Sequence, residues 1–114
     1  MSFHASARQA GGLVIVDAAG RMTLEDGRTQ LRDLIHVHTG NGRPKFLLNL
    51  SAVEFIDSYG IGELARCYGV VRQRGGDLRL IGGSKKIRET LEITRLHLLF
   101  RVYESEGEAL KEFS

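Results

Sequence analysis

Short apolar runs alternate along the chain with longer segments in which apolar residues recur every three to four positions. The short runs predict β-strands, and they cover residues 13–16, 45–50, 77–82 and 98–103. Residues 3–9 give a weaker strand signal. The glycine pair at 11–12 that follows predicts a hairpin at one edge of a sheet, and Gly20 is expected to end the second strand.

Four longer segments have the periodicity of helices. Thr23 can cap the first, the second begins at Ser58, Ser84 caps the third, and Ser105 with Glu108 forms a capping box for the fourth. The apolar face of the first helix is expected to contain Leu24, Gly27, Leu31, Leu34, Ile35 and His38. The apolar face of the second is expected to contain Ile61, Leu64, Ala65, Tyr68 and Val71, with Cys67 packed near it.

A hairpin followed by alternating helices and strands is typical of α/β proteins. Right-handed crossovers then give a mostly parallel sheet, here of four to five strands with an antiparallel edge hairpin and about four helices. The runs at 45–50, 77–82 and 98–103 are predicted to be parallel neighbours in one sheet. Because no repeat, low-complexity tract or linker interrupts the pattern, we expect residues 1–114 to form a single domain.

The prediction is organised around residues 45–62. The first part of this stretch reads as a strand covered on both faces, the next residues as a short crossing loop, and Asp57 and Ser58 as capping residues at a helix start. Gly60 and Gly62 fall in the first helical turn, where each is less favourable than Ala by about 1 kcal/mol. Either they allow tight packing of helix on strand, or they leave backbone amides near Ser58 open to a partner or an anion.

Composition narrows the class of partner. The 16 Lys and Arg against 14 Asp and Glu give a formal charge of +2, which does not indicate nucleic-acid binding, so a protein or small-ligand partner is expected. The only cysteine, Cys67, excludes an intramolecular disulfide. No apolar run approaches about 18 residues, and the first residues lack the basic and apolar regions of a signal peptide. We therefore expect no membrane association and a cytoplasmic location.

Candidate catalytic and metal-binding groups are sparse. Ile56 stands two positions before Ser58, which breaks the glycine-flanked pattern of a hydrolase nucleophile. His36 and His38 point apart on a helix and cannot share a metal there, and Asp57 lacks the acidic pair that a receiver-type phosphoacceptor needs for Mg²⁺. We expect a protein that is not an enzyme and uses no cofactor or metal, with Ser58 as a hydroxyl that can receive a phosphate.

Three blocks of sequence carry a resemblance to a known family. The blocks F-L-L-N-L-S-A-V-E-F-I-D-S-Y-G-I-G-E-L, R-G-G-D-L-R-L and L-E-I-T-R-L-H-L-L-F-R-V-Y-E-S-E-G-E-A-L are similar to the STAS domain of bacterial anti-sigma factor antagonists, from about Leu13 to Phe113. In that family the serine of D-S-x-G is phosphorylated by a partner that is both a serine protein kinase and an anti-sigma factor. The resemblance implies that Ser58 is this serine and Asp57 its acidic neighbour.

The resemblance also implies a partner-switching cycle. The unphosphorylated form binds the anti-sigma factor and frees the sigma factor, and a PP2C-type phosphatase resets the phosphorylated form. Homodimer formation is left open. Two departures from the family pattern are Asn49, where many members have Asp, and Gly20-Arg21-Met22-Thr23, where many have G-x-L-D. They leave open a stressosome-like or other signalling module as the setting.

The predicted docking surface combines the start of the second helix with the end of the second strand. Its residues are Asp57, Ser58, Tyr59, Gly60, Gly62, Glu63, Arg66, Gly20, Arg21, Met22 and Thr23. The alternative is a STAS-like scaffold or small-ligand module in which Ser58 is never phosphorylated. In that case the two helical glycines would contact a nucleotide or a lipid.

Overall fold

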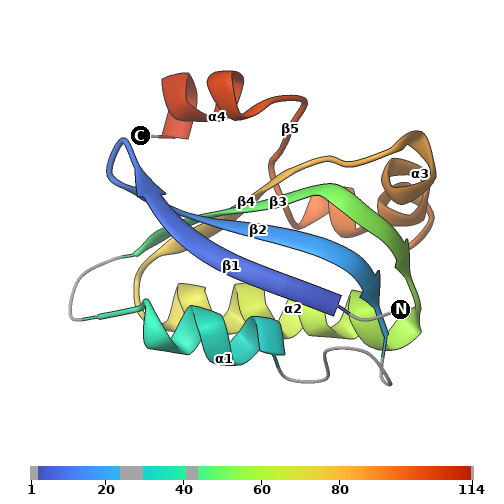
Figure 1. Ribbon diagram of the computed structural model, residues 1–114, viewed down its shortest axis with the longest axis horizontal. Helices are drawn as coiled ribbons and strands as arrows, with labels where there is room; N and C mark the ends of the chain where they lie inside the picture. Colours follow the sequence, from blue (N-terminus) through green and yellow to red (C-terminus); the bar gives the residue numbers. More distant parts are fainter. Residues whose placement is uncertain (1–2, 24–29, 41–43, 114) are drawn as a thin grey trace.

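The computed structural model describes residues 3–23, 30–40 and 44–113. Five strands form one sheet in the order β1-β2-β3-β4-β5, with helices on both sides (Figure 1). The strands are β1 (Phe3–Ala10), β2 (Leu13–Met22), β3 (Lys45–Ile56), β4 (Asp77–Ile81) and β5 (Val102–Tyr103). The helices are α1 (Gln30–Val37), α2 (Ser58–Gln73), α3 (Lys85–Ile93) and α4 (Glu106–Phe113), with a short 3₁₀ helix η1 (Leu96–Leu98).

The sheet is antiparallel at one edge and parallel elsewhere. Ala10 of β1 lies opposite Leu13 of β2, and the turn between them uses Gly11 and Gly12 with φ of 57° and 81°, which favours glycine. β2, β3, β4 and β5 then pair in parallel. The predicted α/β class and the parallel order of the three later strands are confirmed. None of the described helices is both long enough and apolar enough to cross a membrane.

β3 is buried on both faces, as its apolar run predicts. Phe46 and Leu48 belong to the larger core beneath α1, α2 and α3, while Leu47 between them belongs to a smaller core with Phe113 of α4. The side chains of Phe46, Leu47 and Leu48 are all fully buried, and each such side chain stabilises the fold by about 1.5–3 kcal/mol. Figure 1 shows α1 and α2 together on one side of the sheet and α4 on the other.

Two strands are longer than the sequence predicts. β2 continues through Gly20 to Met22, and β3 continues to Ile56 through the residues expected to form a crossing loop. β3 contains two residues more than the part of β2 with which it pairs. One extra residue lies opposite the step from Asp17 to Ala19 and the other opposite the step from Gly20 to Arg21, and the two strands stay paired beyond both. Such bulges break the period of two that would have identified a strand.

The last predicted strand is shorter than expected. Only Val102 and Tyr103 of the run 98–103 are in β5, because η1 and a bend precede it. Phe100 is turned into the larger core, where its ring meets Tyr68 edge-on at 5.2 Å, while Leu98 is 71% exposed.

The helices differ from the prediction in detail. The described part of the first helix begins at Gln30 and buries Leu31 and Ile35 as expected, while Leu24 and Gly27 lie outside the described residues. In α2 the buried face contains Gly60, Glu63, Leu64, Cys67 and Val71, and Ala65 is exposed. The predicted caps of the last two helices are confirmed, since Ser84 Oγ accepts a hydrogen bond from Ile87 N and Ser105 Oγ accepts one from Glu108 N.

Candidate functional site

The site lies where β2 and β3 end and α2 begins, at the same end of the molecule as α3 (Figure 1). Asp57 fixes this junction. Its backbone N–H donates to Met22 O at 3.2 Å, its carboxylate Oδ1 accepts from Gly60 N at 2.9 Å, and its carbonyl accepts from Ile61 N at 3.0 Å. Asp57 is therefore the N-cap of α2, and its carboxylate satisfies one of the amides that a helix start leaves without a partner.

Ser58 is the first residue of α2 and is exposed. Because Asp57 caps the helix, the Ser58 hydroxyl is not needed for that task, and it makes no hydrogen bond within the described part of the chain. From the sequence, either Asp57 or Ser58 could cap this helix. The structure separates their positions: an inward-turned carboxylate, and an exposed hydroxyl at the positive end of a 16-residue helix.

The two glycines of the first turn have different surroundings. A Cβ on Gly60 would lie 2.3 Å from Met22 O and 2.8 Å from Ile56 Cγ2, so this glycine permits close packing of α2 on the ends of both strands. The nearest atoms to a Cβ on Gly62 would be those of the Arg66 guanidinium, at 3.3 Å. Tight packing explains Gly60, whereas Gly62 provides space for an arginine side chain.

Glu63 is a buried carboxylate held by two arginines. It is 2% exposed, and it accepts hydrogen bonds from Arg32 Nε of α1 at 3.1 Å and from Arg66 Nε at 2.9 Å. The charge of Glu63 raises the pKa of Arg32. Burial raises the pKa of the nearby Cys67 thiol to about 12, so this thiol is protonated at neutral pH. Glu63 thus joins α1 to α2 and lies beneath the surface rather than on it.

Two aromatic rings near Ser58 carry cations on their faces. The guanidinium carbon of Arg66 lies 5.3 Å from the centre of the Tyr59 ring. The guanidinium carbon of Arg21 lies 4.7 Å from the centre of the Phe55 ring, and Lys86 Nζ of α3 lies 5.5 Å from it. These separations are within the range of cation–π attraction.

The predicted docking residues therefore gather around one junction but are not equally accessible. Ser58 and Arg66 are exposed, and Arg21 and Tyr59 are partly exposed. The buried ones are Met22, Thr23, Gly60 and Glu63. The sequence reading missed Arg32, Phe55 and Lys86, of which only Phe55 had a local signal, as an aromatic residue two positions before the cap.

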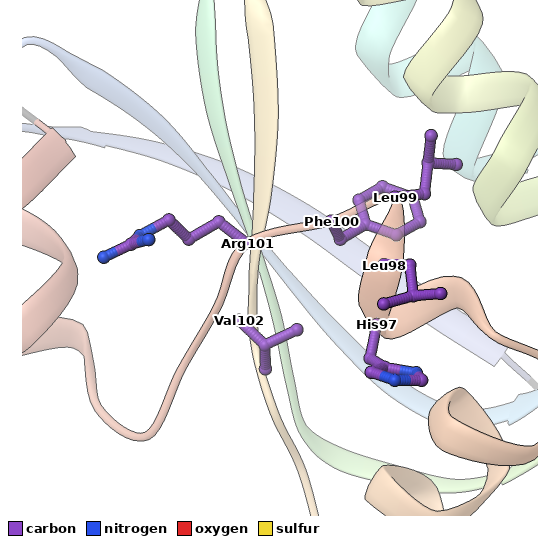
Figure 2. A pocket seen from close by; sticks show the side chains of 6 residues that line it. All are labelled: His97, Leu98, Leu99, Phe100, Arg101 and Val102. Atoms are coloured by element: carbon purple, nitrogen blue, oxygen red, sulfur yellow. The ribbon is translucent and has the colours of Figure 1, made fainter.

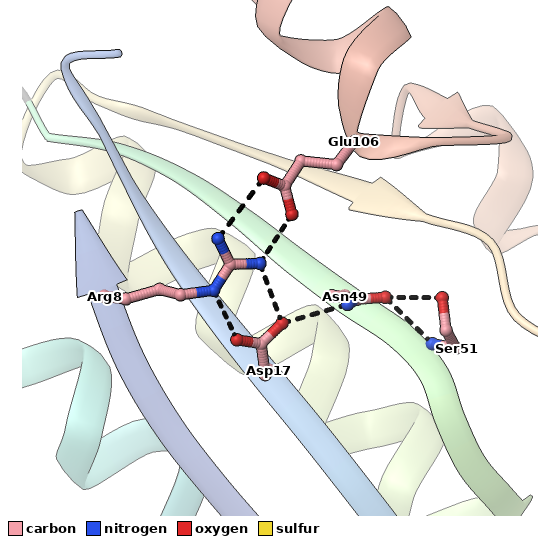
Figure 3. A network of polar contacts seen from close by, with 5 residues as sticks. All are labelled: Arg8, Asp17, Asn49, Ser51 and Glu106. Atoms are coloured by element: carbon pink, nitrogen blue, oxygen red, sulfur yellow. Dashed lines mark hydrogen bonds and ion pairs between the residues drawn. The ribbon is translucent and has the colours of Figure 1, made fainter. Parts of the chain in front are cut away.

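Asn49 belongs to a polar network on the face of the sheet near α4 (Figure 3). Arg8 of β1 binds Asp17 through Nε at 2.7 Å and Glu106 through Nη2 at 2.5 Å, and Asn49 Nδ2 donates to Asp17 Oδ1 at 2.9 Å. The Arg8 guanidinium lowers the pKa of both carboxyl groups. On its other side Asn49 Oδ1 accepts from the amide and the hydroxyl of Ser51.

The donor and acceptor of Asn49 are both used. An aspartate in its place would bring a second carboxylate to the oxygen of Asp17, where the asparagine amide now donates. This is a structural reason for the departure from the family pattern at position 49.

Away from this junction, residues 97–102 line an open hollow (Figure 2). Leu98, Leu99 and Phe100 lie on one side of the segment, while Arg101 projects away from them. The hollow is open to solvent and its lining is more polar than apolar, unlike the concave, mostly apolar pockets that small ligands occupy. No group of three or more His, Cys, Asp or Glu side chains suited to a metal is found in residues 3–23, 30–40 and 44–113.

Sequence and structure comparisons agree with this architecture. The STAS domain model matches residues 4–109, so the chain belongs to the STAS domain family. Curated relatives that match this chain include anti-sigma factor antagonists. A candidate anti-sigma factor antagonist of Thermotoga neapolitana is 35% identical over 71 residues, which is 62% of this chain and 63% of that relative.

Solved structures show the same fold. An anti-sigma factor antagonist from Mycobacterium paratuberculosis superposes with a TM-score of 0.82 at 23% identity, covering 96% of this chain and 92% of its own. The Bacillus cell-fate determinant SpoIIAA, solved in its phosphorylated form, gives a TM-score of 0.71 at 18% identity, covering 97% of this chain and 100% of its own. At these identities the likeness establishes the fold.

Proposed function

We propose that this protein is an anti-sigma factor antagonist whose binding is switched by phosphorylation of Ser58. In the unphosphorylated state it binds an anti-sigma factor that is also a serine protein kinase, and so releases the sigma factor. A PP2C-type phosphatase returns the phosphorylated form to the binding state. The observation that carries this proposal is the exposed Ser58 hydroxyl at the first position of α2, which takes no part in capping the helix.

The geometry suits a reversible modification. A phosphate adds a charge of about −1.5 to −2, and the positive end of the α2 dipole favours that charge. Because Asp57 already holds the helix start through Gly60, the hydroxyl can be modified without removing a capping bond. The phosphate then alters what the junction binds and leaves the fold in place.

The proposal is tested by phosphorylation with the cognate kinase. This kinase must first be identified, beginning with the products of neighbouring genes. The full chain, Ser58→Ala and the control Ser51→Ala are incubated with kinase and ATP, and peptide mass spectrometry locates the phosphate. We expect one phosphate on Ser58 in the first and third proteins and none in Ser58→Ala. Ser51 is a suitable control because its exposed hydroxyl lies seven positions earlier on β3. An unchanged yield from Ser58→Ala would exclude the proposed switch.

A further inference from the structure

We propose that the surface around Ser58 is built to dock an acidic face of the partner protein, an inference that rests on the proposed docking at Ser58. The two aromatic rings that carry cations, Phe55 and Tyr59, stand three residues before and one residue after this serine. The cations on these rings come from β2, α2 and α3, and Arg32 of α1 joins them through Glu63, so the folded junction gathers them from distant parts of the sequence. The sequence charge of +2 gave no sign of such clustering.

On the Tyr59 side, the buried carboxylate of Glu63 fixes two arginines. Arg66 donates its Nε to Glu63, so its two Nη nitrogens are directed over Gly62 and make no hydrogen bond within the described part of the chain. Arg32 is held by the other oxygen of the same carboxylate. The Arg32 and Arg66 side chains are 30% and 46% exposed. Two oriented guanidinium groups with unused donors match carboxylate geometry.

On the Phe55 side, one ring is shared by two cations. Arg21 comes from the end of β2 and Lys86 from the first turn of α3, and both approach the partly buried Phe55. Aromatic and arginine side chains together are typical of the centres of protein interfaces, and an ammonium beside them adds charge. This half of the surface favours an acidic partner over an apolar one.

Two of the three carboxylates in residues 54–66 are turned inward, toward partners within the fold. Asp57 is turned toward the Gly60 amide and Glu63 is buried under its two arginines, so among residues 54–66 only Glu54 is an exposed carboxylate. The groups that this surface presents to a partner are therefore the donors of Arg32, Arg66 and Lys86, which suit carboxylate oxygens. Charge complementarity of this kind raises the association rate and excludes partners of like charge.

This arrangement gives phosphorylation a second effect. A phosphate on Ser58 places negative charge between the Phe55 and Tyr59 pairs and repels the same acidic face that the cations attract. Phosphorylation then slows the association of the partner by charge repulsion, in addition to disturbing the contact between the two surfaces.

The first test needs no knowledge of the partner. The ¹⁵N-labelled full chain is titrated at low ionic strength with a peptide of alternating Asp and Glu, and amide shifts are followed. We expect the largest shifts at residues 21, 55, 59, 66 and 86, weaker binding by Arg66→Gln and Lys86→Gln, and unchanged binding by Lys111→Gln on α4. Largest shifts elsewhere, or an equal loss in the Lys111 variant, would overturn the proposal. Duplex DNA that binds this surface more tightly at equal charge concentration would overturn it in favour of a nucleic acid.

The second test uses the anti-sigma factor kinase and measures association rates from low to high salt. Arg66→Glu and Lys86→Glu should slow association at least about tenfold at low ionic strength and flatten its salt dependence, and Lys111→Glu should not. If Arg66→Glu and Lys86→Glu associate as fast as the native chain, the acidic docking face is refuted while the Ser58 switch is unaffected. If the unmodified chain binds no anti-sigma factor, the proposed function fails and the peptide titration alone decides this inference.

Discussion

Replacing Glu63 with Gln is the most direct test of how the junction is held together. Gln has nearly the same size but no charge, so Arg32 and Arg66 would lose the carboxylate that they share. Removing one partner of a buried ion pair typically costs about 3–5 kcal/mol, because the other charge is left buried. Here the two arginine side chains are 30% and 46% exposed and can regain water, so we expect a smaller loss.

We estimate the loss of unfolding free energy for Glu63→Gln at about 1–3 kcal/mol, the range measured for hydrogen bonds to charged groups. At about 4 °C per kcal/mol for a chain of this size, the Tm should fall by about 4–12 °C. Urea is the suitable denaturant because it does not screen charges. The matched control is Arg66→Gln, which leaves Glu63 paired with Arg32 and should cost no more than about 1 kcal/mol.

Two results would contradict this reasoning. If Glu63→Gln and the native chain unfold within about 0.5 kcal/mol of each other, the buried carboxylate is not a stabilising anchor. If Arg66→Gln is the more damaging change, then the stacking of Arg66 on Tyr59 outweighs the shared ion pair.

Three further predictions concern neighbouring parts of the fold. Gly60→Ala should destabilise strongly, because its Cβ would lie 2.3 Å from a backbone oxygen of β2, whereas Gly62→Ala should be tolerated; chemical denaturation compares them. Asp57→Ala should cost about 0.5–2 kcal/mol as a lost N-cap and Ser58→Ala less than about 0.5 kcal/mol, and the reverse order in thermal melts would be inconsistent with the capping assignment. Arg8 lowers the pKa of its two carboxylate partners, so their contribution to stability is present above about pH 4 and is lost as the pH falls through their lowered values. Arg8→Gln should therefore flatten the acid limb of a curve of Tm against pH, and an unchanged limb would rule this out.

The parts of the fold that follow from local pattern could be predicted from the sequence. The start of α2 combines a capping residue with helical periodicity, and both signals lie within a few residues of Ser58. β3 reads as central because its first half is apolar at nearly every position. The extension of β3 was missed because its bulges depend on pairing with β2, more than thirty residues earlier in the chain.

The partners of the charged residues in the site could not be predicted for a similar reason. Glu63 has the spacing of a buried position, but a carboxylate is buried only when partners are available, and one of these, Arg32, lies 31 residues away. Lys86 is 31 residues after Phe55 and reaches it only because α3 starts beside the end of β3. Local periodicity carries no information on either pairing.

Phosphorylation of Ser58 should leave the stability of the fold nearly unchanged, because of where the nearby carboxylates and cations lie. From the sequence alone, the negative charges of Asp57 and Glu54 are expected to repel a phosphate on Ser58. In the structure the Asp57 carboxylate accepts a hydrogen bond from the Gly60 amide, while Arg21, Arg66 and Lys86 lie around the same junction. Together with the helix dipole, these cations should keep the Tm of the phosphorylated chain within a few degrees of the unmodified value.

Binding should respond quite differently. A phosphate on Ser58 brings like charge against the acidic face of a partner that covers this serine, which costs several kcal/mol, so the affinity should fall at least about a hundredfold. Calorimetric titration of the anti-sigma factor with the Ser58, phospho-Ser58 and Ser58→Ala forms measures this loss, and melting curves of the same samples measure the stability. Equal affinities for all three would remove the switch. A large drop in Tm on phosphorylation would mean that the phosphate acts by unfolding the junction, because a surface effect leaves the buried contacts of Gly60 and Glu63 unchanged.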